Sequence, residues 1–319
     1  MREYLVVFLV AAAVTYLLTV FAREIALRTN AVAAIRDRDV HAEPIPYLGG
    51  LALLGGLVAA YVVARELPFL SASQDFVFRD AGVVLVAGAL ICAVGVVDDI
   101  VELDALTKLG GQVLAAGLLI YSGVQYYSVL DTNGGQILLV PSQGALLTVF
   151  VVVATINAVN FVDGLDGLAA GVVGIGAASF FLFCYQLTVI TDATRATTAA
   201  LLSAALAGAC AGFLVHNSHP ARIFMGDSGS MLIGLVLSAS TLTLTGQFSA
   251  NELVTDQGTG PSFLPVILPV LLPVAILIVP LVDLLLAVVR RTRAGRSPFA
   301  PDKQHLHHRL LEIGHSHRR

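Results

Sequence analysis

Charged residues are scarce in this sequence, and their scarcity excludes most kinds of soluble protein. Only 13% of the 319 residues are charged, whereas a soluble globular domain carries about 25%. The 57% of hydrophobic residues excludes a disordered chain as well. A net charge of -4 and a pI near 6.0 leave no basic excess with which to bind a nucleic acid. The composition therefore indicates an all-α, polytopic membrane protein.

Cysteine is also rare. The three cysteines, Cys92, Cys184 and Cys210, lie inside apolar runs. An odd number of thiols forms no complete disulfide framework, and their spacing matches no metal-ligand pattern. We expect them to fill space between helices. Internal repeats and low-complexity linkers are absent from the sequence too, so we expect a single transmembrane domain over residues 1–319.

Long apolar runs, in contrast, are abundant. A helix that crosses a bilayer needs about 17 to 25 mostly apolar residues. Nine such runs are present, with approximate bounds 4–22, 47–64, 81–97, 106–121, 145–162, 168–190, 197–215, 228–245 and 264–289. A transmembrane β-barrel would instead show segments of about ten residues with alternating polarity. The sequence therefore predicts nine transmembrane helices.

The first and last of these runs have particular features. The first resembles a signal peptide, but Arg2 is the only basic residue before it. No small-residue cleavage site leads from it into a soluble domain, so we interpret it as a span. The last contains Pro265, Pro269, Pro273 and Pro280, which bend or break a helix. Such a break would provide either a side groove for a lipid tail or a kinked structural helix.

The distribution of basic residues predicts the orientation in the membrane. Of the 18 Lys and Arg residues, 14 lie in the connections 23–46, 98–108 and 216–227 or in the tail 290–319. The other four are Arg2, Arg65, Arg79 and Arg195. Because basic loops stay in the cytoplasm, we expect the N-terminus outside and the His- and Arg-rich tail inside the cell.

Polar residues gather in four segments on the predicted cytoplasmic side. These are Asp98-Asp99, residues 157–167, residues 216–230 and residues 302–310. Acidic groups next to apolar spans are costly unless they are paired, hydrated or bound to a cation. Mg²⁺ binds a few oxygen ligands together with waters and substrate phosphates, and it would offset the repulsion among the carboxylates. The pattern favours a Mg²⁺-dependent active site.

Each segment also has a simpler interpretation. Asp98-Asp99 alone would be a solvated helix cap, and residues 163–167 alone would be a turn. Gly226-Asp-Ser-Gly resembles the nucleophile segment of chymotrypsin-like proteases, but no β-barrel is predicted that could hold a His and an Asp beside Ser228. The tail histidines could bind zinc, although no closed ligand set is evident. The occurrence of all four segments on one face favours the active site.

The motifs, taken in order, resemble those of the polyprenyl-phosphate N-acetylhexosamine-1-phosphate transferases, the MraY/WecA superfamily. They are Asp98-Asp99, Asn160-x-x-Asp163-Gly-Leu-Asp166-Gly, Asn217 through Phe224-Met-Gly-Asp227-Ser-Gly-Ser, and His305-x-His307-His308. The resemblance runs from the 41–50 loop to the tail. It implies that a UDP-N-acetylhexosamine and a polyprenyl phosphate react at the cytoplasmic face of a bacterial plasma membrane, releasing UMP. It also allows a homodimer.

The resemblance further implies roles for individual residues. Asp227 and Asn160 would bind Mg²⁺ or Mn²⁺, and Asp98 and Asp99 would form the lipid-phosphate site, with Asp98 as the candidate base. Lys108 would add a positive charge beside the phosphates. The nucleotide sugar would be surrounded by Asp163, Gly164, Leu165, Asp166, Asn217, Arg222, Phe224, His305, His307 and His308, with Phe224 stacked on uracil. One-step and covalent two-step reactions remain open, and we favour one step.

Three details refine the resemblance. The tail reads His305-Leu-His-His-Arg-Leu, similar to the WecA/TagO branch, which uses UDP-N-acetylglucosamine (UDP-GlcNAc) to start cell-envelope polymers. MurNAc-pentapeptide enzymes instead have three histidines followed by Phe-Glu. Tyr47 stands where the branch usually has Arg, so a phosphate contact through that charge is lost. Relatives also usually continue for one or two spans beyond the position of Arg319.

Other functional classes fit the sequence less well. Transfer of MurNAc-pentapeptide 1-phosphate is the alternative within the superfamily. A secondary transporter also uses buried acids and broken helices, but it would place them near the middle of the bilayer. A CDP-alcohol phosphotransferase would carry the run Asp-x-x-Asp-Gly-x-x-Ala-Arg, which the sequence lacks. A non-catalytic envelope scaffold is the last alternative.

Overall fold

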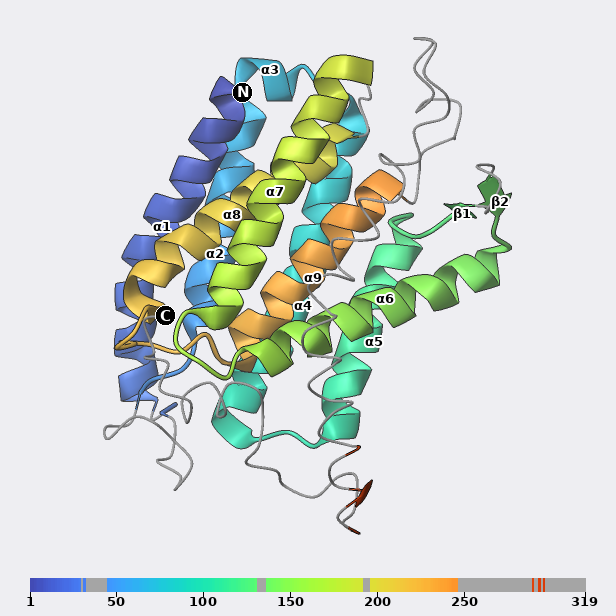
Figure 1. Ribbon diagram of the computed structural model, residues 1–319. Coiled ribbons are helices and arrows are strands. Elements are labelled where there is room, and N and C mark those ends of the chain that lie inside the picture. The colour runs from blue at the N-terminus through green and yellow to red at the C-terminus, as the bar shows by residue number, and fades with distance from the viewer. Residues whose placement is uncertain are drawn as a thin grey trace.

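The computed structural model describes residues 1–29, 31–32, 45–130, 136–191 and 196–245, and the separate positions 289, 292, 293 and 295. These residues form a bundle of helices (Figure 1). The helices are α1 (Arg2–Arg28), α2 (Gly49–Glu66), α3 (Pro68–Ser71), α4 (Asp75–Val101), α5 (Ala105–Tyr121), α6 (Pro141–Val162), α7 (Leu168–Thr191), α8 (Ala196–Asn217) and α9 (Gly226–Thr245). A short antiparallel hairpin, β1 (Ser128–Leu130) and β2 (Gln136–Leu138), lies between α5 and α6.

Seven of the helices, α1, α2, α4, α6, α7, α8 and α9, are long and apolar enough to cross a membrane. Together with α5, which has 17 residues, they correspond to the first eight predicted runs. The prediction of a polytopic helical membrane protein is therefore confirmed. The ninth run, with its prolines, falls outside the described residues except for Val289, so the number of spans and the sides of the termini stay predictions.

The hairpin was not expected from the sequence. Each of its strands has three residues, with Ser128 opposite Leu138. A strand so short shows no alternation of polar and apolar residues long enough to detect. It lies in the polar connection before α6, away from the apolar runs, so it leaves the helical assignment unchanged.

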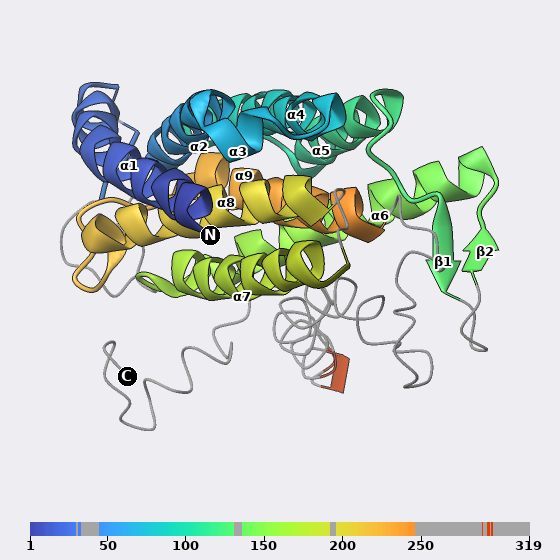
Figure 2. The same ribbon diagram turned by 90° about the horizontal axis from the view of Figure 1, so that it is seen from above.

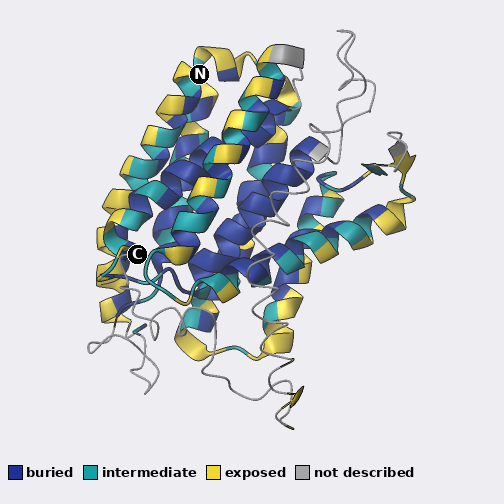
Figure 3. Cartoon of the chain, in the orientation of Figure 1, coloured by how far each residue is buried: buried dark blue, intermediate teal, exposed yellow. Residues whose placement is uncertain are grey.

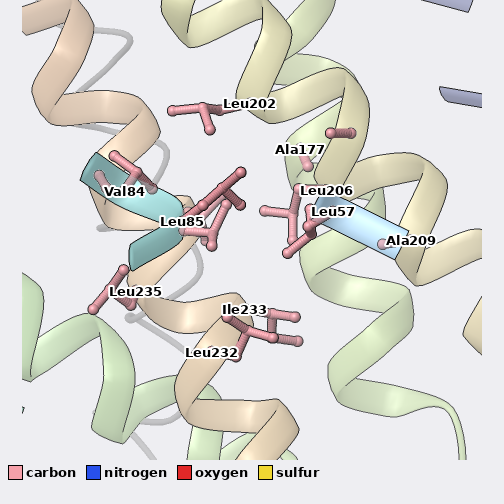
Figure 4. Packing of buried hydrophobic residues seen from close by; sticks show 14 of the residues in the cluster. Leu57, Val84, Leu85, Ala177, Leu202, Leu206, Ala209, Leu232, Ile233 and Leu235 are labelled. Atoms are coloured by element: carbon pink, nitrogen blue, oxygen red, sulfur yellow. The ribbon is translucent and has the colours of Figure 1, made fainter. Parts of the chain in front are cut away.

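Helices α8 and α9 lie in the middle of the bundle, between the row of α2 and α4 and the helix α7 (Figure 2). In their most apolar stretches 83% and 94% of the residues are buried, against 28% in α1. Leu57 of α2, Leu85 of α4, Leu206 of α8 and Ile233 of α9 pack together in this interior (Figure 4). Two central helices surrounded by the others give the bundle one continuous core.

The outer faces of the bundle are apolar as well. Helix α1 exposes Leu5, Leu9, Leu17 and Phe21, and exposed residues follow the outer sides of the helices (Figure 3). Water would make such a surface costly, whereas lipid tails accept it. The pattern is the one expected of helices surrounded by a bilayer.

The beginning of α9 is held unusually close to two neighbouring helices. A Cβ atom at Gly95 of α4 would overlap the backbone of Ser228, and one at Gly50 of α2 would overlap the peptide between Ser228 and Gly229. Only glycine lets three backbones approach in this way. The first turn of α9 is thus fixed between α2 and α4, which matters because Asp227 belongs to that turn.

Candidate active site

Three helices bring Lys108, Asp98 and Asp227 together. The ammonium group Nζ of Lys108 on α5 lies 2.6 Å from Oδ2 of Asp98 on α4 and 2.8 Å from Oδ2 of Asp227 on α9. Asp98 also accepts a hydrogen bond of 2.7 Å from the backbone N–H of Leu103. One cation therefore compensates two carboxylates that lie far apart in the sequence.

The start of α5 explains why Lys108 is so placed. Asp104 caps the helix, and its Oδ1 accepts hydrogen bonds from the backbone N–H groups of Leu106 and Thr107. Hydrogen bonds from Thr107, above all from its hydroxyl, lower the pKa of Asp104 below its usual value. Because this cap fixes the first turn of α5, Lys108, one turn later, is directed toward α4 and α9.

Asn160, near the end of α6, completes this group. Its Nδ2 donates to Oδ1 of Asp227 at 2.8 Å and to Oγ of Ser230 at 2.9 Å. The structure thus brings together four of the predicted site residues: Asp98, Lys108, Asn160 and Asp227. Ser230 was not singled out from the sequence, although it lies one turn after Asp227 on the same helix.

The donor set suits a hard cation. Asp98 and Asp227 offer carboxylate oxygens within one cluster, and Asn160, whose amide nitrogen donates to Asp227, carries an amide oxygen as a further donor atom for a metal. Among the described residues no group of three or more His, Cys, Asp or Glu is arranged as a metal cage. Mg²⁺ does not need one, because it takes one or two carboxylates and completes its shell with waters and substrate phosphates. The residues present fit such an ion.

Asp163 follows directly after α6 and is half-buried. Its burial, together with the negative charges of Asp227 and Asp99, raises the pKa of Asp163 to about 7. The neighbouring Gly164 is exposed and Leu165 is half-buried, so this turn remains open to a ligand. A carboxyl group with such a pKa would change its charge readily near neutral pH.

Asp166 and Asn217 hold the two loops of the site together. Oδ2 of Asp166 accepts from Nδ1 of His219 at 2.7 Å and from the backbone N–H of Ala221 at 3.1 Å. The buried Asn217 accepts from the N–H of Gly167 and donates to the carbonyl of Ile223, both at 3.0 Å. These bonds join the α6–α7 turn to the α8–α9 connection, and contacts of either residue with a nucleotide sugar stay predictions.

The α8–α9 connection is also paired with the segment before α2. The N–H of Phe224 donates to the carbonyl of Pro46, and the N–H groups of Gly49 and Gly50 donate to the carbonyls of Phe224 and Met225. The ring of Tyr47 lies 6.0 Å from that of Phe224, centroid to centroid. Tyr47 thus extends the aromatic surface beside Phe224, which the sequence alone did not indicate.

The remaining predicted residues differ in how they are placed. Arg222 is exposed, and its carbonyl accepts a hydrogen bond of 3.2 Å from Nε of Arg23. The half-buried carboxylate of Asp99 accepts from the backbone N–H groups of Asp227, at 2.7 Å, and Ser228, at 3.2 Å. The tail histidines His305, His307 and His308 lie outside the described residues.

A pair of amides, the buried Gln112 and the half-buried Asn157, lies one turn deeper in the bundle. Nδ2 of Asn157 donates to Oε1 of Gln112 at 2.7 Å, which links α6 to α5. Gln112 follows Lys108 by four residues and Asn157 precedes Asn160 by three, so each stands on the helix face of a site residue. This spacing is the signal by which the sequence could have revealed the pair.

Comparison with known proteins identifies the family. Residues 81–245, just over half of the chain, match the sequence profile described as glycosyl transferase family 4. The chain is 49% identical to the decaprenyl-phosphate N-acetylglucosaminephosphotransferase of Mycobacterium tuberculosis (strain ATCC 25618 / H37Rv), covering 100% of this chain and 78% of that protein. The chain belongs to glycosyl transferase family 4.

More distant relatives match nearly the whole chain as well. The probable undecaprenyl-phosphate N-acetylglucosaminyl 1-phosphate transferase of Bacillus subtilis (strain 168) is 31% identical over 100% of this chain and 80% of its own length. The undecaprenyl-phosphate alpha-N-acetylglucosaminyl 1-phosphate transferase of Salmonella typhi is 27% identical over 92% of this chain and 72% of its own. The resemblance noted from the motifs is thereby confirmed.

Proposed function

We propose that this protein transfers N-acetylglucosamine 1-phosphate from UDP-GlcNAc to a polyprenyl phosphate and releases UMP. The observation that carries the proposal is the convergence of Asp98, Lys108, Asn160 and Asp227 at one end of a membrane-spanning bundle. Three relatives, named as N-acetylglucosamine phosphotransferases or N-acetylglucosaminyl 1-phosphate transferases of a decaprenyl or undecaprenyl phosphate, support the same reaction.

The reaction joins the two phosphate groups. An oxygen of the lipid phosphate attacks the phosphorus next to N-acetylglucosamine, and the bond from that phosphorus to the bridging oxygen breaks. UMP leaves with the bridging oxygen and its electron pair. Because the transferred group needs little covalent help from a protein, positioning and charge neutralisation supply most of the catalysis.

The residues divide this work. Asp227 and Asn160 would hold Mg²⁺, or Mn²⁺ in its place, which supplies charge neutralisation at the diphosphate. Lys108 places a further positive charge between Asp98 and Asp227. Asp98 takes the proton of any lipid phosphate that arrives singly ionised, so a one-step displacement needs no covalent enzyme intermediate. Phe224, beside Tyr47, offers an aromatic face to the uracil.

The location follows from the predicted orientation. The four-residue cluster would face the cytoplasm of a bacterium, where UDP-GlcNAc is dissolved and the phosphate of the lipid lies at the bilayer surface. The N-terminus would be outside the cell, nine spans would cross the membrane, and the tail with His305, His307 and His308 would cover the diphosphate. The product would start a cell-envelope glycopolymer, and the enzyme would act alone or as a homodimer.

One reconstituted assay tests the proposal. Purified protein in detergent is mixed with Mg²⁺, labelled UDP-GlcNAc and a polyprenyl phosphate, and both UMP and the lipid-linked product are measured. We expect equal amounts of the two products and no reaction with EDTA. UDP-MurNAc-pentapeptide should be used far more slowly, and its equal use would place the chain with the other branch. Uptake of a solute into vesicles without release of UMP would indicate a transporter and refute the proposal.

A further inference from the structure

We propose that Asp99 is a positioning residue: its carboxylate caps the N-terminus of α9 and thereby fixes Asp227. This inference rests on the proposed function and deepens it. The sequence motif treats Asp98 and Asp99 as one unit at the lipid phosphate. The structure gives the two neighbours different partners, since Asp98 faces Lys108 and Asp99 faces the backbone of α9.

Helix α9 lacks a cap of its own. It begins at Gly226, and the side chain of the residue before it, Met225, has no oxygen that could accept a hydrogen bond from the helix. The first backbone N–H groups of a helix have no partner within the helix, and a capping side chain normally accepts from the second or third of them. Here those groups belong to Asp227 and Ser228, and both donate to Asp99, at 2.7 and 3.2 Å. Asp99 therefore supplies the missing cap from α4.

The packing around Asp99 is close. Gly226 has φ +70°, and a Cβ placed there would lie 2.5 Å from Oδ2 of Asp99 and 2.7 Å from Oδ1. One turn earlier on α4, a Cβ at Gly95 would overlap the backbone of Ser228. The carboxylate thus lies against the backbone of α9 at Gly226, and one turn away the backbones of α4 and α9 are in close contact. A negative charge at a helix N-terminus is also favourable, because the helix dipole is positive there.

The cap controls the place of Asp227. The backbone N–H of Asp227 is bonded to Asp99 while its side chain lies between Lys108 and Asn160. Loss of the cap would free the first turn of α9 and move the Asp227 carboxylate relative to both partners. A displacement of about 1 Å in a reacting group can lower a rate by roughly 10²-fold. Asp99 would thus affect turnover through Asp227, without touching the substrate.

Three variants test this role: Asp99→Ala, Asp99→Asn and the matched control Asp98→Asn. Asp99 accepts through both of its oxygens, from Asp227 at Oδ1 and from Ser228 at Oδ2, whereas asparagine keeps one oxygen, which can still accept from Asp227 and so caps the helix in part. Asp99→Asn should therefore lose less turnover than Asp99→Ala, which should lose roughly 10²-fold. Asp99→Ala should also lower the thermal midpoint without substrate and raise the Mg²⁺ concentration that gives half of the maximal thermal stabilisation. Asp98→Asn, which removes charge from the cluster, should lose more turnover than Asp99→Asn.

Other results would overturn the inference. If Asp99→Asn is as inactive as Asp99→Ala while both keep the wild-type midpoint and Mg²⁺ response, then Asp99 acts through its charge and not as a cap. If the wild-type protein releases no UMP, the proposed function fails. The thermal midpoints of wild type, Asp99→Asn and Asp99→Ala still test the cap in that case.

A double-mutant cycle keeps the test valid even if Asp99→Ala does not fold. Gly226→Ala introduces a methyl group against the carboxylate of Asp99. Asp99→Ser removes that carboxylate, and with it the oxygens that the methyl group would contact. We expect Gly226→Ala to lower the midpoint less in the Asp99→Ser background than in wild type, because contacting residues are not additive. Equal losses in the two backgrounds would show that the residues do not meet, and the inference would fall.

Discussion

Replacing Gly95 with alanine tests the close contact between α4 and α9. The new Cβ would lie 2.6 Å from the carbonyl carbon of Asp227 and closer still to Ser228. Non-bonded carbon atoms settle at about 3.5–4.0 Å, so the helices would have to separate by roughly 1 Å. Overpacking of this kind costs about 1–3 kcal/mol in the free energy of unfolding. A shift of about 1 Å at Asp227 would also lower turnover by roughly 10²-fold.

Thermal unfolding in detergent and release of UMP measure the two effects. Gly110→Ala is the matched control, since Gly110 is a helical glycine of α5 whose added Cβ would meet nothing within 4 Å. Alanine favours a helix over glycine by about 1 kcal/mol, so the control should keep or raise the midpoint and retain turnover. A Gly95→Ala protein with wild-type midpoint and wild-type rate would refute the described contact.

Three further predictions concern the charged cluster. Asp227→Asn should nearly abolish UMP release while the fold is kept, because an amide is a weaker Mg²⁺ ligand than a carboxylate; wild-type turnover and Mg²⁺ dependence would contradict the assignment. Lys108→Met leaves Asp98 and Asp227 without their cation. Since the Lys108 side chain is 31% exposed, the loss should be about 1–3 kcal/mol, between the values for exposed and buried pairs. It should appear as a lower midpoint that MgCl₂ partly restores, and an unchanged midpoint would show that the pair contributes nothing. The folded protein keeps the Asp163 proton up to a pH of about 7, whereas the unfolded chain loses it near the ordinary pKa of 3.8. The free energy of unfolding should therefore fall as the pH rises through this window, and Asp163→Asn should flatten that fall; equal slopes for both proteins would be evidence against the raised pKa.

The helices could be predicted from the sequence because the signal for a membrane span is local. A run such as 168–190 is apolar throughout, so it forms a helix in lipid whatever its neighbours are, and α7 covers it. The layering could not be predicted in the same way. The sequences of α1 and α9 are both apolar. In the structure most residues of α1 are not buried, whereas nearly all residues of α9 are. That difference depends on which helices pack around each one.

The site shows the same division between local and distant information. The distribution of basic residues among the loops was enough to predict Asp98 and Asp227 on the same side of the membrane. The resemblance to the family led us to expect Lys108 beside the phosphates. The roles of Asp99 and Asn217 depend on backbone groups in other segments, such as the N–H of Ser228 for Asp99 and the carbonyl of Ile223 for Asn217. No pattern within a single segment reveals a hydrogen bond of this kind, so the sequence grouped Asp99 with its neighbour Asp98.

The backbone pairing of residues 46–50 with Phe224 and Met225 has a consequence for biosynthesis. The ribosome makes the second segment about 180 residues after the first, at roughly 5–20 residues per second. Helices α1 and α2 therefore enter the membrane many seconds before the segment that pairs with residues 46–50 exists. During that time the N–H groups of Gly49 and Gly50 have no partner from the α8–α9 connection. A nascent chain that stops before Ile223 cannot assemble the site, however many of its spans have been inserted.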